Sequence, residues 1–229
     1  MSTDQTKENL ATVQARIAGA ARACGRDPAG VRLVAVSKTV EPAVIQAAYD
    51  AGQRAFGENR AQDLQRKALA LPPDCEWHMI GHVQTNKVRP VVRLAAWIHS
   101  VDSPALLERL ERIAAEEGRR PRVLIEINVA GELNKTGAPV AAAEALLATA
   151  LACPHLDCRG FMTMAPYGAD SGQLRHVFGG LRDLRDRLAA ATGAALPELS
   201  MGMSGDFEVA IEQGATMVRV GTAIFGARH

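Results

Sequence analysis

Short apolar segments and helical segments alternate along almost the whole chain. Eight segments have the length and the aliphatic or β-branched content of buried strands, and they cover about residues 31–40, 54–57, 76–80, 96–99, 122–127, 157–162, 198–201 and 216–220. A helical segment follows each of them, and one more helix, over about residues 4–24, precedes the first strand. This alternation predicts a parallel sheet whose strands are joined by helices.

Two arrangements of such a sheet remain open from the sequence. A closed barrel is the most economical, but a doubly wound open sheet uses the same alternation, since the number of strands does not prove closure. The 229 residues contain no long structureless loop and no break in composition, and barrels of this size form one domain. We therefore expect an α/β fold with a single domain over residues 1–229, a (β/α)8 TIM barrel whose extra N-terminal helix covers the barrel bottom or side.

Charge and cysteine content exclude several classes of protein. The 26 basic and 25 acidic side chains leave a net charge of +1, which provides no broad electrostatic surface for nucleic acid or an anionic membrane. No apolar run approaches the length of a membrane span, and the N-terminus is polar. The four cysteines form no CxxC pair and no disulfide framework. We expect a cytoplasmic protein that binds neither nucleic acid nor a membrane.

The first predicted strand ends in a lysine, Lys38. Its apolar run, 31–36, is followed abruptly by Ser37, Lys38 and Thr39. A lysine at the end of a buried strand must be paired or lose its proton, and a neutral amine can form a Schiff base with an aldehyde such as pyridoxal phosphate. The alternative is a lysine whose stem lies along the strand end while its ammonium group reaches water.

The last two strand ends predict a phosphate site. The loops at 200–205 and 221–222 offer hydroxyl groups and open backbone N–H groups at the carboxyl face, where barrels place their active sites. Taken singly, Ser204 is equally a helix cap and the glycines are turn residues. Arg219 would point inward beside this loop and needs an acceptor such as a ring nitrogen. Together with Lys38, these residues describe a pyridoxal phosphate site.

Other polar groups carry weaker hypotheses. His78 and His82 are four residues apart, but Gly81 lies between them and argues against paired zinc ligation on a helix. A second group of possible metal ligands comprises Cys153, His155, Asp157 and Cys158. It lies where a predicted strand begins, at the amino-terminal face of a barrel, where residues contribute to stability and not to the active site. The remaining polar or glycine residues at predicted strand ends are Glu58, Asn59, His78, Gly81, Ser100, Asp102, Asn128 and Thr163.

Six motifs in order resemble those of the pyridoxal phosphate homeostasis proteins, the YggS/PROSC family. The resemblance runs from about residue 10 to the C-terminus. The motifs are AVSKT (35–39), FGEN (56–59), WHMIGHVQTNK (77–87), GFMTMA (160–165), LSMGMS (199–204) and MVRVGTAIFG (217–226).

The resemblance implies a barrel similar to the N-terminal domain of alanine racemase, with pyridoxal 5′-phosphate as a Schiff base on Lys38. It also implies that Ser204, Gly221 and Thr222 hold the phosphate, that Arg219 faces the pyridine nitrogen and that Asn59 lies against the ring. The implied function is cofactor homeostasis: a carrier that buffers or delivers the reactive aldehyde without robust turnover. The partners it suggests are pyridoxal phosphate itself and the apoenzymes that use it, and we expect a monomer.

An amino-acid racemase dependent on the same cofactor is the alternative. Inverting a stereocentre needs a second base on the opposite face of the substrate, and in alanine racemases a tyrosine of a separate C-terminal domain provides it. Only Tyr49 and Tyr167 exist here. Tyr49 falls on a helix away from the strand ends, whereas Tyr167 follows the sixth strand and could reach the mouth. Arginine beside the pyridine nitrogen also keeps the ring neutral, which weakens carbanion chemistry without excluding slow side reactions, since alanine racemase tolerates the same arrangement.

Overall fold

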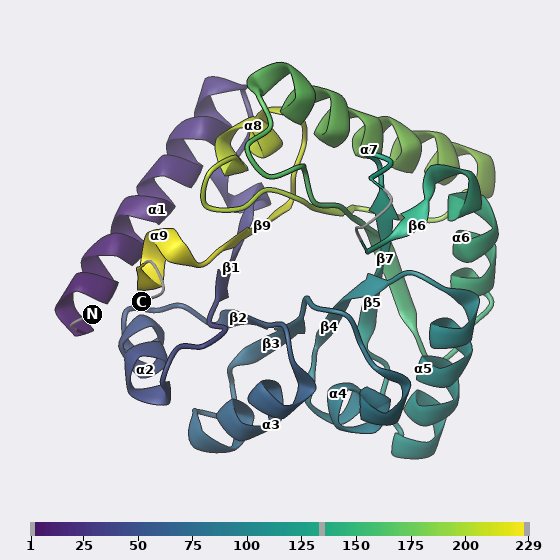
Figure 1. Ribbon diagram of the computed structural model, residues 1–229, viewed down its shortest axis with the longest axis horizontal. Helices are drawn as coiled ribbons and strands as arrows, with labels where there is room; N and C mark the ends of the chain where they lie inside the picture. Colours follow the sequence, from purple (N-terminus) through teal and green to yellow (C-terminus); the bar gives the residue numbers. More distant parts are fainter. Residues whose placement is uncertain (1–2, 133–135, 227–229) are drawn as a thin grey trace.

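The structure, a computed structural model, describes residues 3–132 and 136–226 and shows helices arranged around a central ring of strands (Figure 1). The strands are β1 (Arg32–Val36), β2 (Ala55–Glu58), β3 (Glu76–Met79), β4 (Trp97–Val101), β5 (Arg122–Asn128), β6 (Ala138–Pro139), β7 (Asp157–Met162), β8 (Glu198–Ser200) and β9 (Met217–Val220). The α-helices are α1 (Thr3–Ala23), α2 (Pro42–Asp50), α3 (Ala61–Ala70), α4 (Val88–Leu94), α5 (Pro104–Glu117), α6 (Ala143–Leu151), α7 (Ser171–Thr192), α8 (Phe207–Glu212) and α9 (Thr222–Phe225).

The sheet is a closed barrel of parallel strands. The strand order is β4-β3-β2-β1-β9-β8-β7-β5-β6, and β4 also pairs with β5, which joins the two sides of the sheet. Of these nine strands, β6 pairs only with the end of β5, so eight form the ring. The predicted (β/α)8 barrel is therefore confirmed, and the open sheet is excluded by the β4–β5 pairing.

Two local differences from the sequence prediction concern strand ends. The first strand ends at Val36, because the chain turns at Ser37 and Thr39 takes a left-handed φ of 63°. The two-residue strand β6 was not predicted, since a segment containing a proline and only one paired neighbour has no recognisable strand pattern. The other strands, and the N-terminal helix α1, begin and end within a few residues of the predicted limits.

Local sequence sets the ends of the helices that span the barrel wall. Ser103 caps α5 by accepting a hydrogen bond from the Leu106 N–H, and Pro104 is its first residue. Asp170 and Gln173 form a reciprocal capping box at the start of α7. No helix in the described part of the chain is long and apolar enough to cross a membrane.

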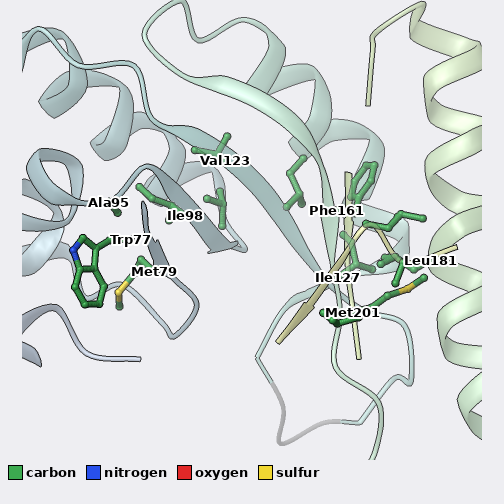
Figure 2. Close-up of a cluster of buried hydrophobic side chains, with 14 of the residues drawn as sticks. Trp77, Met79, Ala95, Ile98, Val123, Ile127, Phe161, Leu181 and Met201 are labelled. Carbon is green, nitrogen blue, oxygen red and sulfur yellow. The ribbon is translucent and has the colours of Figure 1, made fainter. Parts of the chain in front are cut away.

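The core has two layers because alternate strand residues point inward and outward. The outward side chains pack against the helices, and Figure 2 shows Trp77, Ile98, Val123 and Phe161 in one buried cluster with Leu181 of α7. Burying each such side chain stabilises the fold by about 1.5–3 kcal/mol. The inward layer contains a smaller apolar cluster of Trp97, Leu124, Met162 and Met217.

The helix α1 covers the side of the barrel. It packs against α2, α8 and α9 (Figure 1) and buries Leu10, Val13, Ile17 and Ala21. The helices α8 and α9 have only six and four residues, and the much longer α1 packs beside both of them.

Candidate functional site

Lys38 lies at the carboxyl end of β1, on the face where barrel enzymes place their sites. The turn that carries it is fixed by backbone hydrogen bonds from the Ser37 N–H to the Gly57 carbonyl, at 3.0 Å, and from the Val40 N–H to the Ser37 carbonyl, at 2.9 Å. Lys38 itself is half-buried. The strand end therefore holds the lysine backbone in place beside β2.

The loop after β8 and the start of α9 come together through Ser204. The Ser204 Oγ accepts hydrogen bonds from the N–H groups of Gly221, at 3.3 Å, and Ala223, at 3.4 Å. Thr222 lies between these two residues at the first position of α9. Three predicted phosphate ligands, Ser204, Gly221 and Thr222, are thus gathered in one place.

We call Ser204, Gly221 and Thr222 the cradle, and two glycines allow its close packing. Gly202 has a φ of 93°, and a Cβ there would lie 2.6 Å from the Ala210 Cβ. A Cβ on Gly221 would lie 3.1 Å from the Val36 carbonyl oxygen and 3.3 Å from the Val36 Cβ. Since Val36 is two residues before Lys38, the contact with Gly221 places the cradle directly beside the strand that carries the lysine.

Arg219 is buried in the barrel, with an exposed fraction of 4%. Its Nη1 donates to the Ser200 Oγ at 2.6 Å and its Nη2 donates to the Thr163 carbonyl at 2.9 Å. Burial lowers the pKa of Arg219 to about 10, although the negative charges of Glu126 and Asp206 oppose this change. Among residues 3–132 and 136–226, no carboxylate forms an ion pair with the guanidinium group, so a buried cation faces the site with donors but no anionic partner.

Asn59 follows the last residue of β2 and contributes an unsatisfied acceptor. Its side-chain Oδ1 is buried and has no hydrogen-bond partner among the described residues. A buried amide oxygen without a donor is uncommon in a folded protein and calls for a partner from outside the chain, such as a water, an ion or a ligand. The polar groups around Gly221, the donors of Arg219 and this orphaned oxygen are compatible with a phosphorylated ligand whose ring carries hydrogen-bonding atoms.

A buried ion pair lies behind Lys38 on the outer side of the barrel wall. The Nζ of Lys67, on α3, donates to the Glu58 Oε1 at 2.7 Å and to the Ser37 carbonyl at 2.6 Å, and the Ser37 Oγ donates to the same Glu58 oxygen at 2.7 Å. Both charged side chains have an exposed fraction of 0%. Burial raises the pKa of Glu58, while the hydrogen bonds from Lys67 and Ser37 oppose the change. Glu58 was predicted at the mouth of the barrel, but its side chain points outward to α3 because it alternates with Gly57 along β2.

His78 also lies away from the mouth. It is fully buried inside the barrel, with its Nδ1 2.9 Å from the His99 Nε2. His82 is largely exposed, with its Nδ1 3.9 Å from the Asp102 Oδ2. In the cluster at 153–158, the His155 Nδ1 is bound to the Glu111 carboxylate at 2.6 Å. The described residues contain no group of three or more His, Cys, Asp and Glu side chains that could hold a metal ion.

Comparisons with known proteins agree with this geometry. Residues 2–229 match the family model of the alanine racemase N-terminal domain. A pyridoxal phosphate homeostasis protein from Aquifex aeolicus is 43% identical over 222 residues, which are 96% of this chain and 97% of that protein. The chain belongs to the pyridoxal phosphate homeostasis protein family.

Solved structures extend the similarity. PipY of Synechococcus elongatus, in its structure with pyridoxal phosphate bound, is 39% identical to this homeostasis-family chain, with a TM-score of 0.84 over 96% of this chain and 100% of that one. Alanine racemase from Corynebacterium glutamicum has a TM-score of 0.75 but only 19% identity, and the match covers 98% of this chain and 61% of the racemase. That second similarity concerns the fold alone.

Sequence reasoning missed Lys67, His99 and Glu126 in this homeostasis-family chain. Lys67 lies three residues after Leu64, on the apolar stripe of α3, and a lysine in such a stripe is a signal for a buried charge. His99 and Glu126 occupy inward positions of otherwise apolar strands. A strict count of alternate residues along β4 and β5 could have found both.

Proposed function

We propose that this protein binds pyridoxal 5′-phosphate on Lys38 and takes part in the homeostasis of this cofactor, buffering it or delivering it without robust turnover. The observation that carries the proposal is the contact between the cradle and the end of β1, where Gly221 packs against Val36 beside the lysine. The names of the relatives and the pyridoxal phosphate bound to PipY support it.

Each proposed ligand has a distinct part. The Ser204 and Thr222 hydroxyl groups and the Gly221 backbone would hold the phosphate, as polar groups at a strand-to-helix turn commonly do. Arg219 would donate to the pyridine nitrogen, and Asn59 would meet the ring region. The Lys38 amine would hold the aldehyde carbon covalently.

The residues of this chain favour holding the cofactor over catalysis. When bound, pyridoxal phosphate supplies an aldehyde that reacts with amines and a ring that withdraws electrons. Arg219 donates hydrogen bonds but keeps its own proton, since a pKa of about 10 is still well above neutral pH. It therefore leaves the ring nitrogen unprotonated, which makes the ring a weaker electron acceptor.

The two tyrosines do not support a racemase. The Tyr49 hydroxyl donates to the Asp74 Oδ1 at 2.6 Å, and the Arg54 guanidinium lies 3.8 Å from the centre of its ring, at the end of α2 that is remote from Lys38. The pKa of Tyr49 is raised, chiefly by that hydrogen bond. Tyr167 is fully exposed, so no packing orients its hydroxyl group toward the site.

The proposal includes a cytoplasmic monomer that passes the cofactor to apoenzymes. The large apolar side chains on the described surface support the monomer, because Leu69, Val140, Leu151, Tyr167 and Met203 belong to different elements and loops. Solution mass measurement tests this part separately.

Borohydride reduction of the cofactor-loaded protein, followed by peptide mapping, tests the proposal. We expect a visible absorbance band, and a reduced adduct on Lys38 that is absent from Lys38→Ala and retained in Lys87→Ala, which changes another lysine at the same face. Lys38→Ala should still bind pyridoxal phosphate weakly through Ser204 and Thr222. A colourless protein that takes up no cofactor would refute the proposal, and complete loss of binding in Lys38→Ala would refute the cradle. An amino-acid turnover assay beside alanine racemase separates the carrier from the racemase.

A further inference from the structure

Polar side chains from four strands form a continuous hydrogen-bonded chain through the interior of the barrel. The Arg219 Nη1 lies 2.6 Å from the Ser200 Oγ, which lies 2.8 Å from the His99 Nδ1. The His99 Nε2 lies 2.9 Å from the His78 Nδ1, and the His78 Nε2 lies 2.9 Å from the Glu76 Oε1. Arg219, Ser200, His99 and His78 have exposed fractions of 4% or less.

Both histidines are neutral near pH 7. Burial lowers the pKa of His78, and the Glu76 carboxylate only partly opposes the change. Burial lowers the pKa of His99 well below its ordinary value, and the positive charges of Arg219 and Arg32 lower it further. A neutral imidazole has one N–H donor and one acceptor nitrogen.

The two ends of the chain determine the direction of every bond in it. An arginine can only donate, so the Ser200 Oγ accepts from Arg219. The Glu76 carboxylate, whose pKa is lowered chiefly by the hydrogen bond with His78, can only accept. His78 therefore carries its hydrogen on Nε2 and accepts at Nδ1.

The same assignment of donors and acceptors fixes the two bonds in the middle of the hydrogen-bond chain. His99 must carry its hydrogen on Nε2 to donate to His78, and its Nδ1 then accepts the hydrogen of the Ser200 hydroxyl. Reversing a single link would leave two acceptors facing each other, which a buried pair of polar atoms tolerates poorly.

The far end of the chain is held by charges at the amino-terminal end of the barrel. The Arg32 Nη1 lies 2.6 Å from one Glu76 oxygen, and the Arg122 Nη1 lies 3.8 Å from the other. Glu76 is partly exposed and lines a surface cavity of about 560 Å³ beside α1. The buried chain thus ends at a carboxylate that solvent can reach.

We propose that Ser200, His99, His78 and Glu76 act as one oriented hydrogen-bond chain that positions Arg219 and links its charge to the carboxylate at the opposite end of the barrel. Hydrogen bonds in such a series polarise one another. The Glu76 carboxylate therefore strengthens the hydrogen bond between Ser200 and Arg219. The arginine itself forms no ion pair with a carboxylate among the described residues. This inference rests on the proposed function for the identity of the ligand that Arg219 meets, but the chain itself is a property of the protein.

Nitrogen NMR of the cofactor-free protein at about pH 7.5, above the ordinary pKa of a histidine, tests the direction of the chain. We expect both His78 and His99 to be neutral and to carry their hydrogen on Nε2, and the exposed ring of His82 provides the comparison. Protonation of either buried ring on Nδ1, or a charged ring at this pH, would overturn the proposed orientation. The measurement uses the unmodified protein, so it does not depend on whether a variant folds.

Variants in the cofactor-loaded protein test the positioning of Arg219. Glu76→Gln should shift the visible absorbance maximum and accelerate cofactor release by about tenfold. This magnitude is taken from metal sites, where losing the hydrogen-bond partner of a ligand weakens binding by about 10- to 100-fold. Glu111→Gln is the matched control, because its carboxylate also accepts from a histidine nitrogen, that of exposed His155. It should change neither property.

Ser200→Ala should have the larger effect of the two, and Ser200→Thr should restore the parent spectrum because it restores the hydroxyl group. Unchanged spectra and release rates in both Glu76→Gln and Ser200→Ala, with the adduct present on Lys38, would overturn the positioning role. Absence of the adduct on Lys38 would instead contradict the proposed function, while leaving the NMR result on the chain intact.

Discussion

The Lys67 Nζ and the Glu58 Oε1 lie 2.7 Å apart in an ion pair that is completely buried between α3 and the barrel wall. The same ammonium group binds the Ser37 carbonyl, which belongs to the peptide bond preceding Lys38. The pair therefore fixes the backbone at the point where β1 ends. A charge in this position stabilises the fold only as long as its partner is present.

Lys67→Met should lower the free energy of unfolding by about 3 kcal/mol, because it leaves the buried Glu58 carboxylate without its cation. Urea unfolding of the cofactor-free protein measures the change. The double variant Lys67→Met/Glu58→Gln should recover part of the loss, and Lys7→Met, at an exposed position of α1, should stay within about 0.5 kcal/mol of the parent. Equal losses for Lys67→Met and Lys7→Met would show that the pair does not stabilise the strand end.

The stability of Lys67→Met should also depend on pH with a defined sign. Burial raises the pKa of Glu58 above its ordinary value of 4.5, and the variant removes the cation that opposes this rise. Between the ordinary and the raised pKa the folded protein binds more protons than the unfolded chain, so the free energy of unfolding falls as pH increases. Unfolding at a series of pH values from about 4.5 upward should show a steeper fall for Lys67→Met than for the double variant, which lacks the carboxyl group. Parallel curves would contradict this assignment.

The candidate site residues whose positions the sequence could predict are those that follow from the end of a strand. Lys38 and Arg219 could be placed because a parallel barrel brings the carboxyl ends of its strands to one face. The contact that gathers Ser204 and Gly221 connects two loops separated by α8 and β9. The sequence paired these loops because both follow the last two strands, but it did not predict that the Ser204 hydroxyl oxygen accepts from the Gly221 N–H.

The sequence did not reveal to which side of the barrel wall a polar strand residue points or which distant residue it contacts. Glu58 belongs to the outer layer and His78 to the interior, although both lie in strands and both were expected at the mouth. Whether a polar strand residue reaches the mouth depends on how close it lies to the carboxyl end of the strand and on whether its side chain points into the barrel or toward the helices. Lys67 binds Glu58 on the outer side, and His99 binds His78 inside the barrel. Those partners lie 9 and 21 residues away in the chain and have no spacing motif.

Thiol reactivity should separate the cysteines by burial. Burial raises the pKa of Cys75 and of Cys158 to about 11, so at pH 8 only about one thiol in a thousand is the reactive thiolate at these positions. A disulfide reagent at pH 8 should modify exposed Cys24 first and half-buried Cys153 more slowly, and should reach the other two only in urea. Cys24→Ser should remove the fast phase. Rapid modification of all four thiols in the native protein would contradict the burial of Cys75 and Cys158.

Ser204→Ala should weaken pyridoxal phosphate binding by about tenfold, because it removes one hydroxyl donor to the phosphate and leaves the N–H groups of Gly221 and Ala223 without their acceptor. Equilibrium dialysis measures the affinity, and added inorganic phosphate should compete less well in the variant than in the parent. The reduced adduct should still map to Lys38. Ser171→Ala, at the exposed start of α7, is the control. Unchanged affinity and competition in Ser204→Ala would remove this residue from the cradle.

Arg219→Met should separate the demands of binding from those of folding. The substitution takes a buried cation out of the barrel and keeps a long apolar stem, but it deprives the Ser200 hydroxyl and the Thr163 carbonyl of a donor. These effects oppose each other, so the free energy of unfolding of the cofactor-free protein should change by no more than about 1 kcal/mol. Cofactor affinity should fall at least about tenfold, since a charge-assisted hydrogen bond is lost. Urea unfolding without cofactor and equilibrium dialysis with it measure the two quantities. A loss of stability as large as that of Lys67→Met, with affinity unchanged, would make Arg219 a structural residue and not a ligand of the ring.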